Sequence, residues 1–129
     1  MPWNTVRVDA PRNLTSALNS FDDLWSPRIV TRINDYDVRV AKTHGDHVWH
    51  VHEDSDELFL VWRGQMVIQM EGRPDVIIGP GEFFVVPRGV EHRPVAEAEC
   101  EVLLLEPAGL VNTGEAEAGD MTAPNVEWM

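Results

Sequence analysis

The chain has 129 residues, 43% of them apolar and 25% charged, which is the length and composition of one globular domain. Its 22 acidic and 10 basic side chains give a formal net charge of −12. This charge would repel nucleic acids and anionic membrane surfaces, so we expect neither as a partner. The single cysteine, Cys100, excludes an intrachain disulfide, and no segment approaches the roughly 20 apolar residues of a membrane span. Residues 1–13 contain no signal-peptide pattern, so we expect the protein in the cytoplasm.

Residues 1–27 are predicted to form an N-terminal arm that carries one short helix. Within residues 13–25, Asn13 or Thr15 is suited to cap the first turn of a helix. Three apolar side chains follow at helical spacing: Leu14, Leu18 and Phe21. We therefore expect the helix to pack one face against the body of the protein.

Residues 28–107 have the pattern of an all-β domain. Short runs rich in β-branched and aromatic residues are predicted as strands at 28–33, 36–42, 57–62, 65–70, 75–78, 82–86 and 99–106. Turn residues separate the runs, for example the glycines and prolines at 79–81 and 87–89. Many short strands with no long helix between them predict an antiparallel sandwich or barrel.

The strand pattern ends after Pro107. Residues 108–129 form an acidic tail rich in small residues, which we predict to be partly disordered. Trp128, near the end of this tail, has the apolar surface to anchor it to another part of the molecule.

Four of the five histidines lie within residues 44–52. On an extended segment, His50 and His52 project to the same side about 6–7 Å apart, a suitable span for two ligands of one metal ion. Glu57 follows after a polar loop and reaches the same place if that loop folds back. The fifth histidine, His92, follows the turn at 87–89 and is predicted to begin another strand. It is far along the chain, so only the fold could bring it to the others.

Two segments resemble the motifs of the cupin family. Residues 45–64 resemble the first motif, which is histidine, one residue, histidine, four residues, glutamate, six residues and glycine. Residues 81–92 resemble the second, which is glycine, five residues, proline, one residue, glycine, two residues and histidine. Two positions depart from the pattern: Gly45 lies one residue closer to His50 than usual, and Ala96 stands where asparagine is often found. The stretches WHVHEDSDELFLVWRG and GEFFVVPRGVEHRP are similar in particular to small single-domain cupins related to mannose-6-phosphate isomerase.

The resemblance covers residues 28–107 and implies a jelly-roll barrel with a metal at one mouth. Its ligands, by position in the motifs, would be His50, His52, Glu57 and His92. Imidazole and carboxylate ligands suit Fe, Mn, Zn, Ni or Cu, so we expect one divalent transition metal per chain, whose identity the ligands do not fix. Four protein ligands leave two positions open on a six-coordinate ion, but they close a tetrahedral site.

The sequence identifies no catalytic residue, but it offers candidates for a substrate pocket. His47 lies beside the ligand pattern, where it either lines the entrance or faces solvent. Lys42, Arg39 and Arg93 are bases near the motif segments that could hold a substrate carboxylate or phosphate. Each of them could equally form a surface ion pair with one of the many acids. Cys100 is predicted to be a small buried side chain rather than a nucleophile.

The predicted strand 57–62 has an apolar outer face that needs cover. If Glu57 points into the barrel, Phe59 and Val61 do too, because side chains alternate along a strand. The remaining apolar side chains then point outward: Leu58, Leu60 and Trp62. The arm, a second sheet layer or a second subunit could cover them. We expect a homodimer, as is common among the proteins that the chain resembles.

Three functions are compatible with these features. The first is a metal-dependent isomerase or epimerase that acts on a small oxygen-rich metabolite such as a sugar derivative, with the metal as Lewis acid. The second is an iron- or manganese-dependent dioxygenase, whose open metal positions would hold O₂ and substrate together. The third is a non-catalytic module that binds a small ligand. In all three, the partner is a small molecule.

Overall fold

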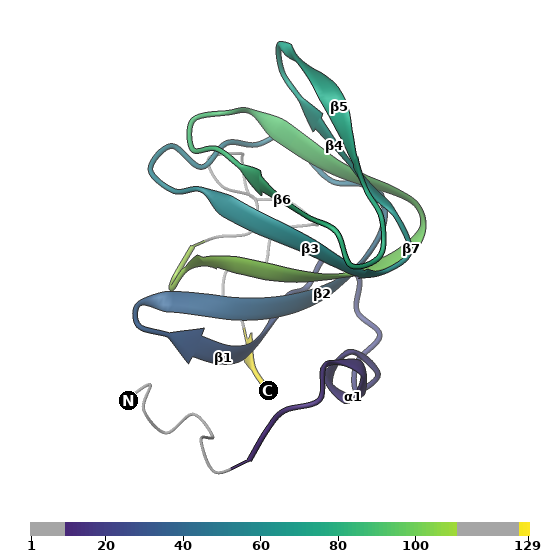
Figure 1. Cartoon of the computed structure of the whole chain (residues 1–129), viewed down its shortest axis with the longest axis vertical. Coiled ribbons are helices and arrows are strands. Elements are labelled where there is room, and N and C mark those ends of the chain that lie inside the picture. Colours follow the sequence, from purple (N-terminus) through teal and green to yellow (C-terminus); the bar gives the residue numbers. More distant parts are fainter. Residues whose placement is uncertain (1–9, 111–126) are drawn as a thin grey trace.

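The predicted all-β jelly-roll is confirmed by the computed structural model, which describes residues 10–110 and 127–129 (Figure 1). The elements are α1 (Leu14–Leu18), β1 (Arg28–Ile33), β2 (Tyr36–Asp46), β3 (Glu57–Arg63), β4 (Met66–Met70), β5 (Arg73–Ile78), β6 (Phe83–Val86), β7 (His92–Pro107) and β8 (Glu127–Trp128). The strands form one sheet in the order β5-β4-β7-β2-β1-β8, and β3 joins it by pairing with β6 and β7. All these pairs are antiparallel except that of β1 with β8. Strand β3 lies side by side with β7 (Figure 1), and the main core cluster takes side chains from every strand from β2 to β7.

The long strand β7 holds the barrel together because it pairs with β2, β3 and β4 along its length. Its partner β3 shows the predicted alternation: Phe59 and Val61 are buried in the core. Leu58 and Leu60 point to the other face and are half-buried, and Trp62 is exposed. Inward apolar side chains of β3 and β7 therefore meet inside the barrel, which drives its closure.

The turn from β3 to β4 depends on Gly64. This residue has φ +87°, a left-handed conformation that side chains other than glycine rarely adopt. A Cβ at this position would lie 2.8 Å from the backbone oxygen of Glu99. Only glycine fits here, and the turn returns the chain into the sheet directly after β3.

The N-terminal arm packs on the outer face of the sheet through α1. Asn13 caps the helix, since its side-chain oxygen accepts a hydrogen bond of 2.9 Å from the backbone N–H of Ser16. Leu18 is fully buried and packs in a cluster with Val30 and Val40. The indole N–H of Trp62 also donates to the Thr15 hydroxyl, at 3.3 Å. The arm therefore covers part of the apolar outer face.

The end of the chain returns to the barrel as β8, which pairs with β1 in parallel. The guanidinium of Arg32 lies over the Trp128 ring, 4.7 Å from its centroid. The predicted disorder of the tail falls largely on residues 111–126, which lie outside the described residues. Within the described part of the chain, no helix is long and apolar enough to cross a membrane.

Candidate metal centre

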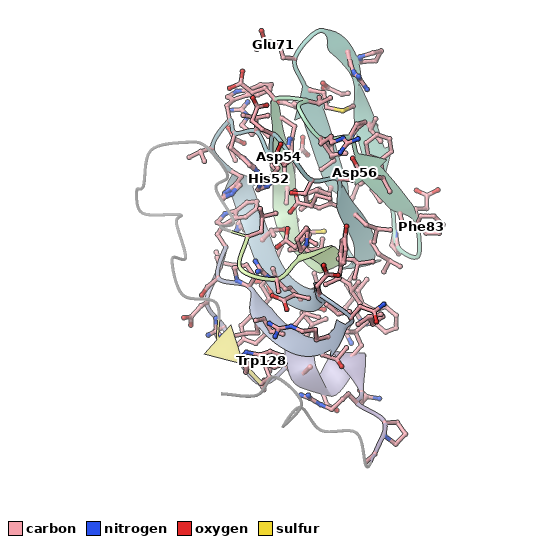
Figure 2. All side chains as sticks on the ribbon, turned by 90° about the vertical axis from the view of Figure 1, so that its left-hand side faces the viewer. His52, Asp54, Asp56, Glu71, Phe83 and Trp128 are labelled. Atoms are coloured by element: carbon pink, nitrogen blue, oxygen red, sulfur yellow. The ribbon has the colours of Figure 1, made fainter. Side chains whose placement is uncertain are left out.

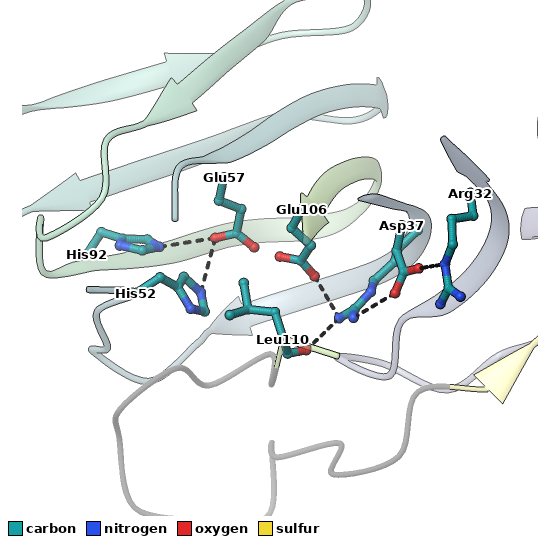
Figure 3. A network of polar contacts seen from close by, with 8 residues as sticks. Arg32, Asp37, His52, Glu57, His92, Glu106 and Leu110 are labelled. Carbon is teal, nitrogen blue, oxygen red and sulfur yellow. Dashed lines mark hydrogen bonds and ion pairs between the residues drawn. The ribbon is translucent and has the colours of Figure 1, made fainter. Parts of the chain in front are cut away.

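Four side chains from distant parts of the sequence converge at one end of the barrel: His50, His52, Glu57 and His92, here called the ligand group. One nitrogen or carboxylate oxygen from each lies within 4.8 Å of the others, and all four residues are buried. Figure 3 shows the His52 and His92 rings directed at the same oxygen of Glu57. The distances from this Oε1 are 3.5 Å to His52 Nε2 and 3.4 Å to His92 Nε2.

Backbone hydrogen bonds bring the two motif segments together. His50 and His92 form an isolated antiparallel bridge, with N–H···O distances of 3.0 and 2.9 Å. The N–H of Gly89 donates to the carbonyl of His52 at 2.9 Å. Both histidines of the first motif lie in the connection between β2 and β3 rather than inside a strand, and Glu57 is the first residue of β3. The pairing with the second motif, rather than a continuous strand, therefore orients the imidazoles.

Two of the imidazoles are fixed so that Nε2 faces the centre of the group. His50 Nδ1 lies 2.8 Å from the Val48 carbonyl oxygen, and His92 Nδ1 lies 2.9 Å from that of Val90. A carbonyl only accepts, so each Nδ1 carries the proton and donates it. The lone pair of each Nε2 is then available to a metal, and such partners commonly orient histidine ligands.

The polar atoms that face the centre lack hydrogen-bond partners among the described residues. These atoms are His52 Nε2, Glu57 Oε1 and His92 Nε2, and the other nitrogen of the His52 ring, Nδ1, is likewise buried without such a partner. Buried polar atoms are otherwise almost always paired, because an unpaired one loses its hydrogen bonds to water. The donor set thus fits a divalent transition metal, which would be held by these four side chains.

The protonation states also suit a metal. Burial, and next the neighbouring His92, lower the pKa of His50 from 6.5 to about 3, so this imidazole is neutral near pH 7. Burial alone would raise the pKa of Glu57, but contacts with His52, His92 and Glu106 outweigh it and lower that pKa well below 4.5. An uncharged imidazole beside an ionised carboxylate is the form in which both groups bind metals.

A small pocket adjoins the ligand group, with a cavity volume of about 40 Å³. Its polar lining consists of Thr43, His47, His50, Glu57 and Glu106. Its apolar lining includes Trp25, Pro27, Phe59, Met66, Val102 and Leu104. A molecule in this pocket would therefore touch two of the four ligand side chains while lying mainly against apolar walls.

Glu106 is a pocket residue that the sequence analysis missed. The pairing of Leu58 with Leu105 places Glu57 and Glu106 side by side on the inner face of β3 and β7. Burial, and next the Glu57 carboxylate, raise the pKa of Glu106 well above 4.5, which the Arg39 guanidinium offsets only in part. The alternation of Val102, Leu104 and Glu106 on the inner face was a usable signal for this acid.

Of the four predicted pocket residues, His47 belongs to the lining, whereas Lys42, Arg39 and Arg93 do not. His47 is buried and its ring stacks on Trp25. Arg39 is buried in ion pairs with Asp37 and Glu106. The other two bases contact aromatic rings and acids: Lys42 lies near Phe21 and Asp22, and Arg93 near Trp49 and Asp46. Each of the three bases thus has partners within the chain.

Comparisons with known proteins agree with this architecture. The profile of the Cupin domain family matches residues 36–106, which include the whole ligand group. The chain is 30% identical over 82 residues to the uncharacterized protein YdbB of Bacillus subtilis (strain 168), covering 64% of this chain and 73% of that protein.

Two solved structures are similar in both fold and sequence. A cupin-2 domain containing protein from Shewanella frigidimarina NCIMB 400 has a TM-score of 0.72 and 38% identity, over 74% of this chain and 93% of that one. Protein NMB1881 from Neisseria meningitidis has a TM-score of 0.70 and 31% identity, over 77% of this chain and 100% of the other.

Proposed function

The chain belongs to the cupin family, and from this premise we propose that it is a metal-dependent enzyme acting on a small oxygen-bearing molecule. The observation that carries the proposal is the ligand group, whose buried donor atoms converge without partners beside a pocket. A binding pocket next to unusual buried polar groups is the arrangement expected of an active site.

The ligand group, the carbonyls that orient it and the apolar walls would each have a separate role in catalysis. The ligand group would hold the metal, which when bound supplies a Lewis acid for a substrate oxygen. The Val48 and Val90 carbonyls keep His50 and His92 in the tautomer that binds. The apolar walls would exclude water from the substrate, which strengthens electrostatic interactions inside the pocket.

The lining of the pocket favours dioxygenation over isomerisation or epimerisation of a sugar derivative. A sugar derivative, as handled by relatives of mannose-6-phosphate isomerase, would place several hydroxyl groups against apolar side chains. Each hydroxyl that lies against these apolar walls would lose hydrogen bonds to water, at about 1–3 kcal/mol each. A phosphosugar would also need a free base, whereas Lys42, Arg39 and Arg93 lie outside the lining. A less polar substrate that shares the metal with O₂ fits these walls better.

Metal analysis of protein purified without a nickel column tests the first part of the proposal. We expect one divalent transition metal per chain, with iron or manganese favouring dioxygenation. His52→Ala should lose the metal, whereas the matched control His44→Ala should keep it, because His44 is exposed and lies outside the ligand group. Wild-type protein that binds no such metal would contradict the proposal.

The reaction is tested with small phenols and sugar phosphates, each supplied in air and under anaerobic conditions. A dioxygenase consumes O₂ with a phenol and stops without it, since both oxygen atoms enter the product. Anaerobic turnover of a sugar phosphate would support the isomerase instead. Ligand binding that survives His52→Ala, with no turnover of any compound, would favour the non-catalytic binding module.

We further propose that the protein is a homodimer in the cytoplasm. The outer face of β3 and β6 remains partly uncovered by the arm: Phe83 is 68% exposed and Val85 42% exposed. Figure 2 shows Phe83 projecting from the sheet. A second subunit on this face would bury apolar surface. Light scattering should give twice the chain mass, and Phe83→Asp should shift the protein toward the monomer; a wild-type monomer at micromolar concentration would contradict this.

A further inference from the structure

The wall of the pocket nearest His47 comes from outside the segment that matches the family profile. Trp25 and Pro27 lie in the arm before β1, whereas the matched segment begins at Tyr36. Both residues line the same pocket as the metal ligands His50 and Glu57. The arm therefore contributes to a site that the barrel would otherwise build alone.

Trp25 is held firmly in this position. Its backbone N–H donates to the Lys42 carbonyl at 2.8 Å, beside an isolated bridge between Leu24 and Lys42. Its φ of 55° is unusual for a tryptophan and persists only where surrounding contacts compensate for it. Such contacts fix the ring in the wall.

The Trp25 ring offers an apolar surface to the pocket. Its indole N–H donates to the His44 carbonyl oxygen at 3.0 Å, which occupies the single polar group of the ring. The ring also stacks on His47, with centroids 4.6 Å apart and planes 13° from parallel. His47 in turn lies with its edge toward His50, at a centroid distance of 5.1 Å. A row of three rings thus connects the wall to the ligand group.

Three polar residues of the lining lie in the ligand group or next to it, and a fourth, His47, lies between Trp25 and His50. His50 and Glu57 are in the ligand group, and Glu106 lies beside Glu57. The Thr43 hydroxyl donates its proton to the Cys100 carbonyl at 2.9 Å. A bound molecule can therefore find polar partners for its oxygen atoms near the ligand group and apolar contacts along most of the remaining wall.

We propose that Trp25 is a specificity-determining residue, and that the substrate carries its oxygen atoms at one end and a compact apolar body, such as a ring, that lies against Trp25. This inference rests on the proposed function, because it places the oxygen-bearing end at the metal. It specifies the class of substrate and assigns its selection to the arm.

Two hydroxamates that share one metal-binding head test the proposal. Acetohydroxamate and benzohydroxamate are titrated calorimetrically into cobalt(II)-loaded protein, and they differ only in the methyl or phenyl group that occupies the pocket. We expect the phenyl compound to bind wild-type protein about tenfold more tightly or better, because its ring becomes buried. Trp25→Ala should reduce this preference to about a third or less, and Trp25→Phe should keep most of it, because phenylalanine restores an aromatic wall.

Trp62→Ala is the matched control. Trp62 is also hydrogen-bonded to the arm, through Thr15, but it lies on the outer face and not in the pocket. Trp62→Ala should therefore leave the ratio of the affinities for benzohydroxamate and acetohydroxamate unchanged. Equal affinity of the two hydroxamates in wild-type protein, or equal loss of the preference in Trp25→Ala and Trp62→Ala, would overturn the proposal.

A second measurement needs no metal and separates this inference from the proposed function. Phenol titrated into metal-free protein should shift the indole N–H resonance of Trp25, identified by its loss in Trp25→Phe, and leave that of Trp62 in place. No shift at Trp25 would overturn the inference even if cobalt binds. A chain that shows the shift but takes up no metal would support this pocket while contradicting the metal-dependent function.

Discussion

Two groups of buried polar residues lie close together in the barrel and differ in how their atoms are paired (Figure 3). In the ligand group, all four side chains are buried, and His52 Nε2 and His92 Nε2 lie 3.5 and 3.4 Å from the Glu57 oxygen that they face. The second group, here called the charge network, consists of Arg32, Asp37, Arg39 and Glu106. Its ion pairs are short: 2.7 Å for Arg32–Asp37, 3.1 Å for Arg39–Asp37 and 2.7 Å for Arg39–Glu106.

The way in which the charges face one another distinguishes polar residues that stabilise the fold from residues that form a binding site. The charge network pairs opposite charges, and Arg39 also donates to the Leu110 carbonyl at 2.9 Å. Each charged side chain of the network thus has an opposite charge beside it without any ligand, although Arg39 Nε and both Glu106 oxygens make no hydrogen bond to the described part of the chain. The ligand group places acceptors opposite acceptors, an arrangement that a cation would stabilise. Burial and unpaired atoms occur in both groups, whereas the arginine–carboxylate ion pairs occur only in the charge network.

The largest expected effect comes from breaking the charge network with Arg39→Met. The side chains of Arg39, Asp37 and Glu106 are at most 1% exposed, so the variant leaves buried Glu106 without its arginine and Asp37 with Arg32 alone. We expect a loss of about 3–5 kcal/mol in the free energy of unfolding, measured with urea on the metal-free protein. Arg63→Met is the control: the Arg63 side chain is 53% exposed in its pair with Glu101, so the loss should be about 1 kcal/mol or less. Similar losses in both variants would contradict a structural role for the network.

The next effect is on metal affinity, through His92→Ala. Removing a residue that merely supports a ligand weakens metal binding about 10–100-fold, so removing a ligand should weaken it by about 100-fold or more. Calorimetric titration with zinc measures this, and His44→Ala should bind like the wild type. An unchanged zinc affinity in His92→Ala would show that the metal, if any, binds elsewhere.

The smallest effect for a single step, one pH unit, is the pH dependence that His50 gives to the stability of the metal-free protein. The pKa of His50 is about 3 in the folded chain and 6.5 ordinarily. Between pH 3 and pH 6.5, His50 is therefore protonated in the unfolded chain but not in the folded chain. The free energy of unfolding therefore falls as the pH is lowered from 6.5, by at most about 1.4 kcal/mol per pH unit from this residue, and the term is absent above 6.5. Urea unfolding at a series of pH values should show a shallower slope in His50→Gln. Equal slopes would mean that His50 is not buried in its neutral form.

Much of the fold was predictable because local patterns and tertiary structure agree. The predicted strand at 28–33 coincides with β1, and the one at 57–62 is β3 without its last residue. The strand predicted to start at His92 and the one predicted at 99–106 are a single strand, β7, and the residues between them were not predicted as strand. Pro94 and the alanine and glutamate residues near it have low strand propensity. Pairing with β4, including Pro94 opposite Ile68, imposes the strand there.

The candidate site was predictable in part for a similar reason. Motif spacing selected all four members of the ligand group, since their order along the chain is regular. Trp25 could not be predicted, because it reaches the pocket through contacts with Lys42 and His44 that leave no local pattern. For the bases, proximity in sequence suggested a role that the structure does not show. Arg39 was predicted as a pocket residue, but its side chain forms ion pairs with Asp37 and Glu106 instead.

The X-ray absorption spectrum of the metal bound to the purified chain tests the central claim most directly. It reports the atoms around the metal without requiring a substrate. The ligand group predicts the scattering pattern of three imidazoles with additional oxygen neighbours, and a loss of imidazole scattering in His92→Ala. A spectrum with oxygen neighbours alone, or one that His92→Ala leaves unchanged, would contradict the account.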